Sequence, residues 1–142
     1  MGRGPARPVP QPRDDVAEPL RRLRLICRAL PGVTEKVSHG EPTFWVGRRM
    51  FAQLDNHHHG APHVGVWLAM PLGAQEALVY ADPKRYYVPP YVGTRGWVGV
   101  RLDARPSWTQ IARVVRDAHA FIAKPARTRP PAGRAAPRGP RR

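Results

Sequence analysis

The sequence predicts an α+β domain in which an antiparallel sheet carries an N-terminal and a C-terminal helix on one of its faces. Apolar residues recur at helical spacing near both ends of the central part of the chain, and between these segments they alternate at a period of two. Turn residues separate the alternating segments at short intervals, as in a sheet of neighbouring antiparallel strands. Because a helix buries one stripe and a strand buries one face, both helices are expected on the same side. The opposite face of the sheet is then open or covered only by loops.

The first helix is expected from Asp15 to Leu30. Asp15 followed by Glu18 resembles a capping box, in which the two side chains satisfy the first free N–H groups of the helix. Pro31-Gly32 ends the helix. Its apolar stripe consists of Leu20, Leu23, Cys27 and Leu30.

Between the helices the hydrophobic period changes to two. Thr43–Val46 and Met50–Leu54 read as a hairpin around Gly47-Arg48-Arg49. Further strands are expected at His63–Met70 and Trp97–Leu102, with a short one near Tyr86–Val88. Residues 71–82 are expected to form a short helix or an extended crossover.

The last helix is expected between Ser107 and Lys124. Ser107 is an N-cap residue and Gln110 stands three positions later, which predicts a capping box. Pro125 disfavours continuation of the helix beyond Lys124. The apolar stripe consists of Trp108, Ile111, Val115, Ala118 and Ile122.

The two ends of the chain differ in composition from the part between them. Residues 1–13 and 125–142 are rich in proline and arginine and contain no acidic residue, so we expect disordered basic arms around one folded domain at 14–124. The net charge is +14, but residues 14–124 hold 15 Lys and Arg against 10 Asp and Glu, so most of the excess lies in the arms. The single cysteine, the lack of a signal core and the lack of a long apolar run predict a cytoplasmic protein with no membrane partner.

Four stretches of the chain resemble the MmcQ/YjbR family of small bacterial proteins over about residues 15–124. They are ALPGV at 29–33, HGEPTF at 39–44 followed by VGRRMFA, DPKRYYVPPYVGTRGWVGVRLD at 82–103, and the closing amphipathic helix. The resemblance implies a CyaY-like α/β sandwich, similar to the double-wing arrangement associated with DNA binding. It therefore implies a DNA-binding protein, and it brings no agreed catalytic residues to this chain.

Basic and aromatic residues interleave in two loops of the expected sheet. Cations can neutralise phosphates while aromatic rings stack or pack, so both loops are candidate contacts to a nucleic-acid backbone. The hypothesis requires the hairpin tip and the loop at 84–95 to lie on one side of the domain, and simple solvation of turn residues is its alternative. The nucleic-acid-binding candidates are Arg48, Arg49, Lys84, Arg85, Tyr91, Arg95 and Arg101.

Strand alternation also gathers aromatic residues on the face away from the helices. The expected members of this face are His63, Gly65, Trp67, Trp97, Gly99, Arg101, Thr43, Trp45, Phe51 and Gln53, with Met50 pointing toward the helices. Small residues beside large rings leave shallow slots, so Trp45, Trp67 and Trp97 are candidates for stacking a planar small ligand or holding a protein partner. In the alternative interpretation the segment 86–91 folds over the tryptophans as a second small core.

Catalysis and metal binding have little support in the sequence. It contains no GxSxG, P-loop, HExxH or dinucleotide fingerprint, so we expect a binding protein with no catalytic residues and no cofactor. His39 beside Glu41 is the nearest approach to an acid/base pair and is interpreted as structural. His57, His58, His59 and His63 are interpreted as a polar turn and not as a metal site, because zinc sites show more regular ligand spacing. A frataxin-like metal role would need an acidic ridge, whereas the first helix is mainly basic after Glu18.

Overall fold

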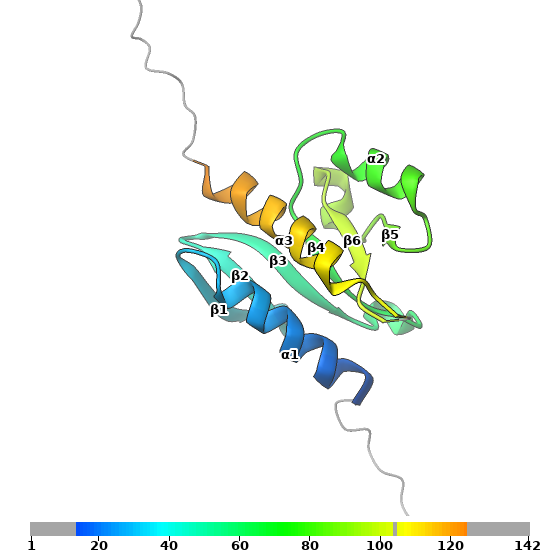
Figure 1. Ribbon diagram of the computed structural model, residues 1–142, viewed down its shortest axis with the longest axis horizontal. Helices are drawn as coiled ribbons and strands as arrows, with labels where there is room; N and C mark the ends of the chain where they lie inside the picture. The colour runs from blue at the N-terminus through cyan, green and yellow to red at the C-terminus, as the bar shows by residue number, and fades with distance from the viewer. Residues whose placement is uncertain (1–13, 104, 125–142) are drawn as a thin grey trace, which may run out of the picture.

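The computed structural model describes residues 14–103 and 105–124 and places six strands in one antiparallel sheet of order β1-β2-β3-β4-β6-β5 (Figure 1). The strands are β1 (Val33–Ser38), β2 (Glu41–Val46), β3 (Arg49–Asn56), β4 (Val64–Leu68), β5 (Tyr86–Tyr87) and β6 (Val98–Arg101). The helices are α1 (Asp14–Arg28), α2 (Ala74–Ala81) and α3 (Trp108–Ala123), with short 3-10 turns η1 (His58–Gly60) and η2 (Val92–Arg95). The arms expected at 1–13 and 125–142 lie outside the described residues. Within the described ranges, no helix has both the length and the hydropathy needed to cross a membrane.

The two terminal helices lie side by side on the same face of the sheet, which confirms the predicted α+β class (Figure 1). Leu23 and Cys27 of α1 and Val115 of α3 are fully buried against the strands. Across from them, Val64, Val66, Leu68, Val98 and Val100 are at most 1% exposed. The alternation read from the sequence therefore places the main core correctly, between the helix layer and one face of β4 and β6.

α2 and η2 form an excursion between β4 and β6. α2 packs against β5 and β6, and its buried Gln75 donates hydrogen bonds to the carbonyl oxygens of Gly93 (2.8 Å) and Trp97 (2.6 Å). These two bonds hold the segment after β5 against the sheet. The residues of this segment, from Tyr87 to Arg95, lie over part of the face that the terminal helices leave uncovered.

The edge strand β1 has no counterpart in the strand pattern of the sequence. It pairs with β2 along its whole length, from Val33 opposite Val46 to Ser38 opposite Glu41. Half of its residues are exposed and none is buried, and Val37 is 71% exposed. An edge strand buried on neither face needs no alternation of apolar residues, so periodicity cannot detect it.

A β-bulge in the β2–β3 hairpin changes which residues of β3 share a face. The register runs Phe44 opposite Ala52 and then Trp45 opposite Met50, so Phe51 has no partner. Phe51 contacts His119 of α3 edge-on, with ring centroids 5.4 Å apart, whereas Met50 shares the face of Trp45. The expectation that Phe51 pointed away from the helices and Met50 toward them is therefore wrong, because a bulge shifts the alternation by one residue.

The ends of the helices agree with the sequence in part. Ser107 accepts a hydrogen bond from the N–H of Gln110 at 3.2 Å, which confirms it as the N-cap of α3. The Gln110 side chain does not complete the box, because its amide nitrogen donates to the hydroxyl of Tyr86. Helix α1 begins at Asp14, one residue before the predicted start. The carboxylate of Asp15 accepts a hydrogen bond from His57 Nε2 at 2.7 Å.

Candidate functional site

The glycine slots on the face away from the terminal helices are filled by the ring of Tyr87. A side chain at Gly99 would overlap that ring, and one at Gly65 would meet the Tyr87 hydroxyl. Trp67 and Trp97 are 5% and 4% exposed, so neither offers an open surface for stacking. These observations favour the interpretation of a second small core over an aromatic platform. Tyr86 takes no part in it, because its hydroxyl reaches Gln110 on the helix side.

A buried carboxylate, Asp55, organises this second core. Its Oδ2 accepts hydrogen bonds from Tyr87 Oη at 2.5 Å and from Trp67 Nε1 at 3.1 Å, and its Oδ1 accepts from the N–H of His58 at 2.9 Å. His63 Nε2 lies 3.4 Å from the same Oδ2. Asp55 is 2% exposed, and these donors from three segments replace the water that the carboxylate loses. No pattern in the sequence marks it, since its partners lie up to 32 residues away.

The third tryptophan of the predicted aromatic face stands apart from the other two. Trp45 is half-buried, its Nε1 donates to the Lys36 carbonyl at 3.4 Å, and the Lys36 ammonium lies 4.8 Å from the ring centroid. It pairs with edge strand β1 and does not line the cavity beside Trp67. The structure therefore does not bring Trp45, Trp67 and Trp97 together as one stacking site.

A cavity of about 490 Å3 remains on this face beside Trp67. Its walls come from the β1–β2 turn, the first residue of β2, β3, η1, β4 and the segment at 91–95. The lining residues are His39, Glu41, Met50, Gln53, Leu54, Asp55, Asn56, His58, Trp67, Tyr91, Val92 and Arg95. The cavity thus contains two carboxylates, Glu41 and Asp55, and one arginine.

Burial and the nearby charge of Asp55 raise the pKa of the Glu41 carboxyl above its ordinary value. The folded protein therefore binds the proton of the Glu41 carboxyl more tightly than the unfolded chain does. Above the raised pKa the ionised carboxylate lowers the stability of the fold. This loss of stability disappears as the pH falls below the ordinary pKa of a glutamate. We expect Glu41→Gln to raise the melting temperature at pH 7.5, with a difference that shrinks toward pH 4. Differential scanning calorimetry at both pH values measures this, and a lower melting temperature at pH 7.5 would contradict it.

The predicted nucleic-acid contacts at the β2–β3 hairpin lie at the C-terminal end of α3. Arg49 Nη1 donates to the carbonyl of Ile122 at 3.2 Å, which joins the hairpin to the last turn of that helix. Arg48, Arg49 and Lys124 are exposed there. Within residues 14–103 and 105–124, none of the three has an ion pair with a carboxylate.

The other predicted basic contacts lie toward the opposite end of the sheet. Arg101 pairs across to Gly65 and thus lies level with Asp55, six residues along β3 from Arg49, or about 20 Å at the rise of a strand. Both arginines of this cluster are paired with acids, Arg101 with Asp103 at 3.0 Å and Arg85 with Asp82 at 3.2 Å. Lys84, Arg85 and Arg101 line one surface pocket together with Asp82 and Asp103. The candidates therefore form two separate groups.

Arg95 and Tyr91 belong to neither basic group, because they lie at the cavity beside Trp67. The Arg95 guanidinium lies 5.7 Å from the centroid of the Trp97 ring. The Tyr91 hydroxyl lies 3.0 Å from His59 Nε2. Both side chains thus have partners within the second core and its rim.

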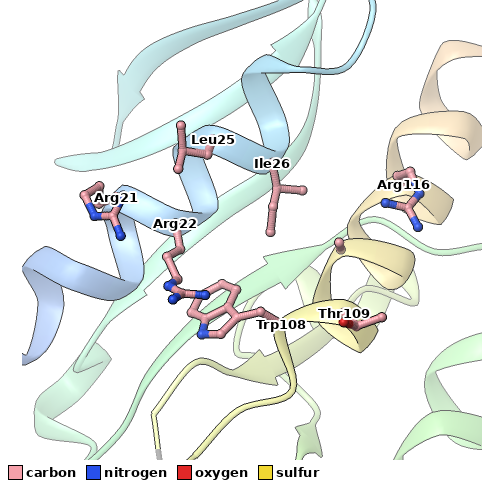
Figure 2. Close-up of a pocket in the computed structure, with 8 residues that line it drawn as sticks. Arg21, Arg22, Leu25, Ile26, Trp108, Thr109 and Arg116 are labelled. Atoms are coloured by element: carbon pink, nitrogen blue, oxygen red, sulfur yellow. The ribbon is translucent and has the colours of Figure 1, made fainter.

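A third basic surface, which sequence reasoning did not predict, is the groove between α1 and α3. Figure 2 shows Arg21 and Arg22 projecting from α1 and Arg116 from α3 on either side of Trp108. The Arg22 guanidinium lies 5.5 Å from the Trp108 ring centroid, and Glu18 bridges Arg21 and Arg22. The sequence does place these arginines on the outward side of the first helix. It does not show that they lie beside Trp108, because that depends on how the two helices pack.

The histidine run and the cysteine have structural surroundings. His57 bonds to Asp15, His59 to Tyr91, and His63 lies beside Asp55. In the part of the chain that the structure describes, no three His, Cys, Asp or Glu residues are grouped to hold a metal ion. Cys27 is fully buried, and desolvation raises the pKa of its thiol, so it stays protonated and unreactive in the core.

Comparison with known proteins places the chain among relatives of this architecture. The model of the family described as YjbR matches residues 28–121. The chain belongs to the YjbR family. The crystal structure of Deinococcus radiodurans protein DR2400, which carries the DUF419 domain, is similar to it with a TM-score of 0.63 and 20% sequence identity, over 84% of this chain and 86% of that one. At this identity the likeness shows the YjbR-type fold alone. No curated protein matches the chain.

Proposed function

We propose that this YjbR-family protein binds DNA through the phosphate backbone, using the hairpin arginines Arg48 and Arg49 together with the basic sequence that follows α3. The observation that carries the proposal is the bond from Arg49 to the Ile122 carbonyl, which holds the hairpin at the end of α3. The chain continues from there into residues 125–142, which contain six arginines and no acidic residue. The hairpin arginines and Lys124, the residue before this basic segment, therefore lie at one end of the domain, here called the basic end.

The charge balance supports the basic end over the other surfaces. Arg48, Arg49 and Lys124 have no acidic partner within the described ranges, whereas Arg85 and Arg101 each have one. The cavity beside Trp67 contains two carboxylates and would repel a phosphate. A cation that no acidic residue neutralises can release a counterion from the DNA when it contacts a phosphate, and this release favours binding. In the α1–α3 groove Arg21 and Arg22 already share the carboxylate of Glu18, so this surface ranks below the basic end.

The test is a salt series of fluorescence-anisotropy titrations with duplex DNA and three forms of the full chain. We expect Arg48→Gln combined with Arg49→Gln to weaken binding and to reduce the negative log–log salt slope by about 2, one for each phosphate that the variant no longer neutralises. The matched control is Lys84→Gln with Arg85→Gln, which removes the same charge from the opposite end and should leave the slope nearly unchanged.

A third form, with the six arginines of 125–142 replaced by glutamine, separates the tail from the domain. If this form does not bind at all while the Arg48/Arg49 variant binds like the parent chain, the folded domain does not contact DNA and the proposal fails. It also fails if the two double substitutions have equal effects, because the attraction would then follow net charge alone.

A further inference from the structure

The cavity beside Trp67 has features that DNA binding does not use. Its volume of about 490 Å3 suits a small organic molecule of one or two rings. It lies on the sheet face opposite α1 and α3 and is walled by residues from distant parts of the chain. The chemistry of these walls decides which class of ligand the cavity can recognise.

The first feature is a carboxylate without a partner. The Glu41 side chain lines the cavity and makes no hydrogen bond or ion pair with any residue in 14–103 or 105–124. The other carboxylate, Asp55, is already bonded to three donors. Glu41 is therefore the group whose hydrogen-bonding capacity is left for a ligand, and its negative charge favours a cation. Burial that raises the pKa of this carboxyl is consistent with a poorly solvated anion.

The second feature is a set of aromatic walls. The ring of His58 stands edge-on to Trp67 and to Tyr91, with centroids 5.3 and 5.4 Å apart. Its Nε2 is buried and has no hydrogen-bond partner among the described residues. His58 and Tyr91 thus offer flat surfaces to the cavity, and His58 also offers one free polar atom. Such walls suit a planar group, and a positive charge also gains from the faces of the rings.

The third feature is the concentration of non-glycine residues with positive φ around this cavity. The non-glycine residues with positive φ in the described ranges are His39, His57, His59, Tyr91 and Arg105. His39 and Tyr91 line the cavity, and His57 and His59 flank His58, which also lines it. Tyr91, at φ 61° and ψ −73°, is the centre of a γ-turn closed by the bond from the N–H of Val92 to the Pro90 carbonyl, at 2.6 Å.

A γ-turn of this hand is rare and strained for a residue with a bulky side chain. Strained backbone conformations of this kind are found most often at ligand-binding sites, where contacts with the surrounding structure stabilise them. Here it places the Tyr91 ring beside His58 and His59, over the cavity.

We propose that the cavity beside Trp67 binds a small planar organic cation, such as an amidinium or a protonated nitrogen heterocycle, with Glu41 as the counter-ion and Tyr91 and His58 as the flat walls. One arginine, Arg95, lines the cavity against two carboxylates, and its guanidinium is placed over Trp97. The net charge of the site therefore opposes an anion. This ligand is distinct from DNA and occupies a different face.

The test compares benzamidine with its neutral analogue benzamide and its anionic analogue benzoate, each titrated into the full-length 15N-labelled chain. The four tryptophan indole N–H signals, assigned by Trp→Phe variants, report where each probe binds. We expect benzamidine to shift the Trp67 signal in a saturable manner and to leave the signal of Trp108, in the α1–α3 groove, unchanged. Benzoate should not shift Trp67, and benzamide should bind more weakly than benzamidine.

Two glutamate variants make the test specific. Glu41→Gln should weaken benzamidine binding about tenfold, as expected for removal of a charged hydrogen bond, while Glu76→Gln, on the exposed side of α2, should not change it. Lowering the pH should weaken binding more in the parent chain than in the Glu41→Gln variant, because only the parent chain can lose the charge of Glu41. The proposal is overturned if benzamidine at 5 mM leaves Trp67 unshifted, if benzoate binds as well, or if Glu41→Gln binds like the parent.

Discussion

Replacing Asp55 with alanine is expected to lower the free energy of unfolding by about 3–5 kcal/mol, the largest effect we expect from a single polar side chain in this protein. The change removes the acceptor for Tyr87 Oη, Trp67 Nε1 and the N–H of His58 at once. Each donor is then buried without a partner, at a cost of about 1–3 kcal/mol apiece. Relief from burying the carboxylate offsets part of this cost. Equilibrium unfolding in urea, followed by tryptophan fluorescence, measures the difference.

Two further substitutions show whether the acceptor role explains the effect. Asp55→Asn keeps the shape but turns an NH2 group toward donors, so it should cost about 2–3 kcal/mol. Asp117→Ala removes an exposed carboxylate from α3 and should stay within about 0.5 kcal/mol of the parent. If Asp55→Ala had an equally small effect, the second core would not depend on this network.

Gly99→Ala is expected to lower the free energy of unfolding by about 3 kcal/mol, because the added methyl group would overlap the ring of Tyr87. The bond to Asp55 holds that ring in place, so either the ring or strand β6 must move. In a Tyr87→Ala background the same substitution should be neutral or slightly stabilising, because alanine is favoured over glycine by roughly 0.5–1 kcal/mol in a strand. A double-mutant cycle measured by urea unfolding gives this coupling directly.

Gly65 provides the contrasting case for that cycle. A methyl group there would meet both the Tyr87 hydroxyl and the carbonyl oxygen of Val100, the latter at 2.8 Å. Removing the Tyr87 ring leaves the backbone contact, so Gly65→Ala should remain destabilising in the Tyr87→Ala background. Equal costs of Gly99→Ala in both backgrounds would show that the Tyr87 ring does not fill the slot.

Together these residues explain why the face opposite the helices is not the open aromatic platform that its sequence suggests. Strand alternation does place Gly65, Trp67 and Gly99 on that face. Strand alternation does not predict that the segment after β5 covers these residues. The position of that segment depends on the hydrogen bonds of Gln75, Tyr87 and Asp55, which join distant parts of the chain. What is left uncovered is the polar cavity at Glu41, at the edge of the second core.

The resemblance of four stretches of the sequence identifies the YjbR family. Local signals in the sequence are enough to predict the α+β class, the helix start at Ser107 and the inward faces of β4 and β6. These signals are the hydrophobic period, caps and turn residues, which act over a few positions. The edge strand β1, the bulge that exchanges Phe51 and Met50, and the separation of the basic residues into groups emerge only in the folded chain. Each of them depends on which strands pair and in what register, and pairing joins residues whose proximity no local pattern records.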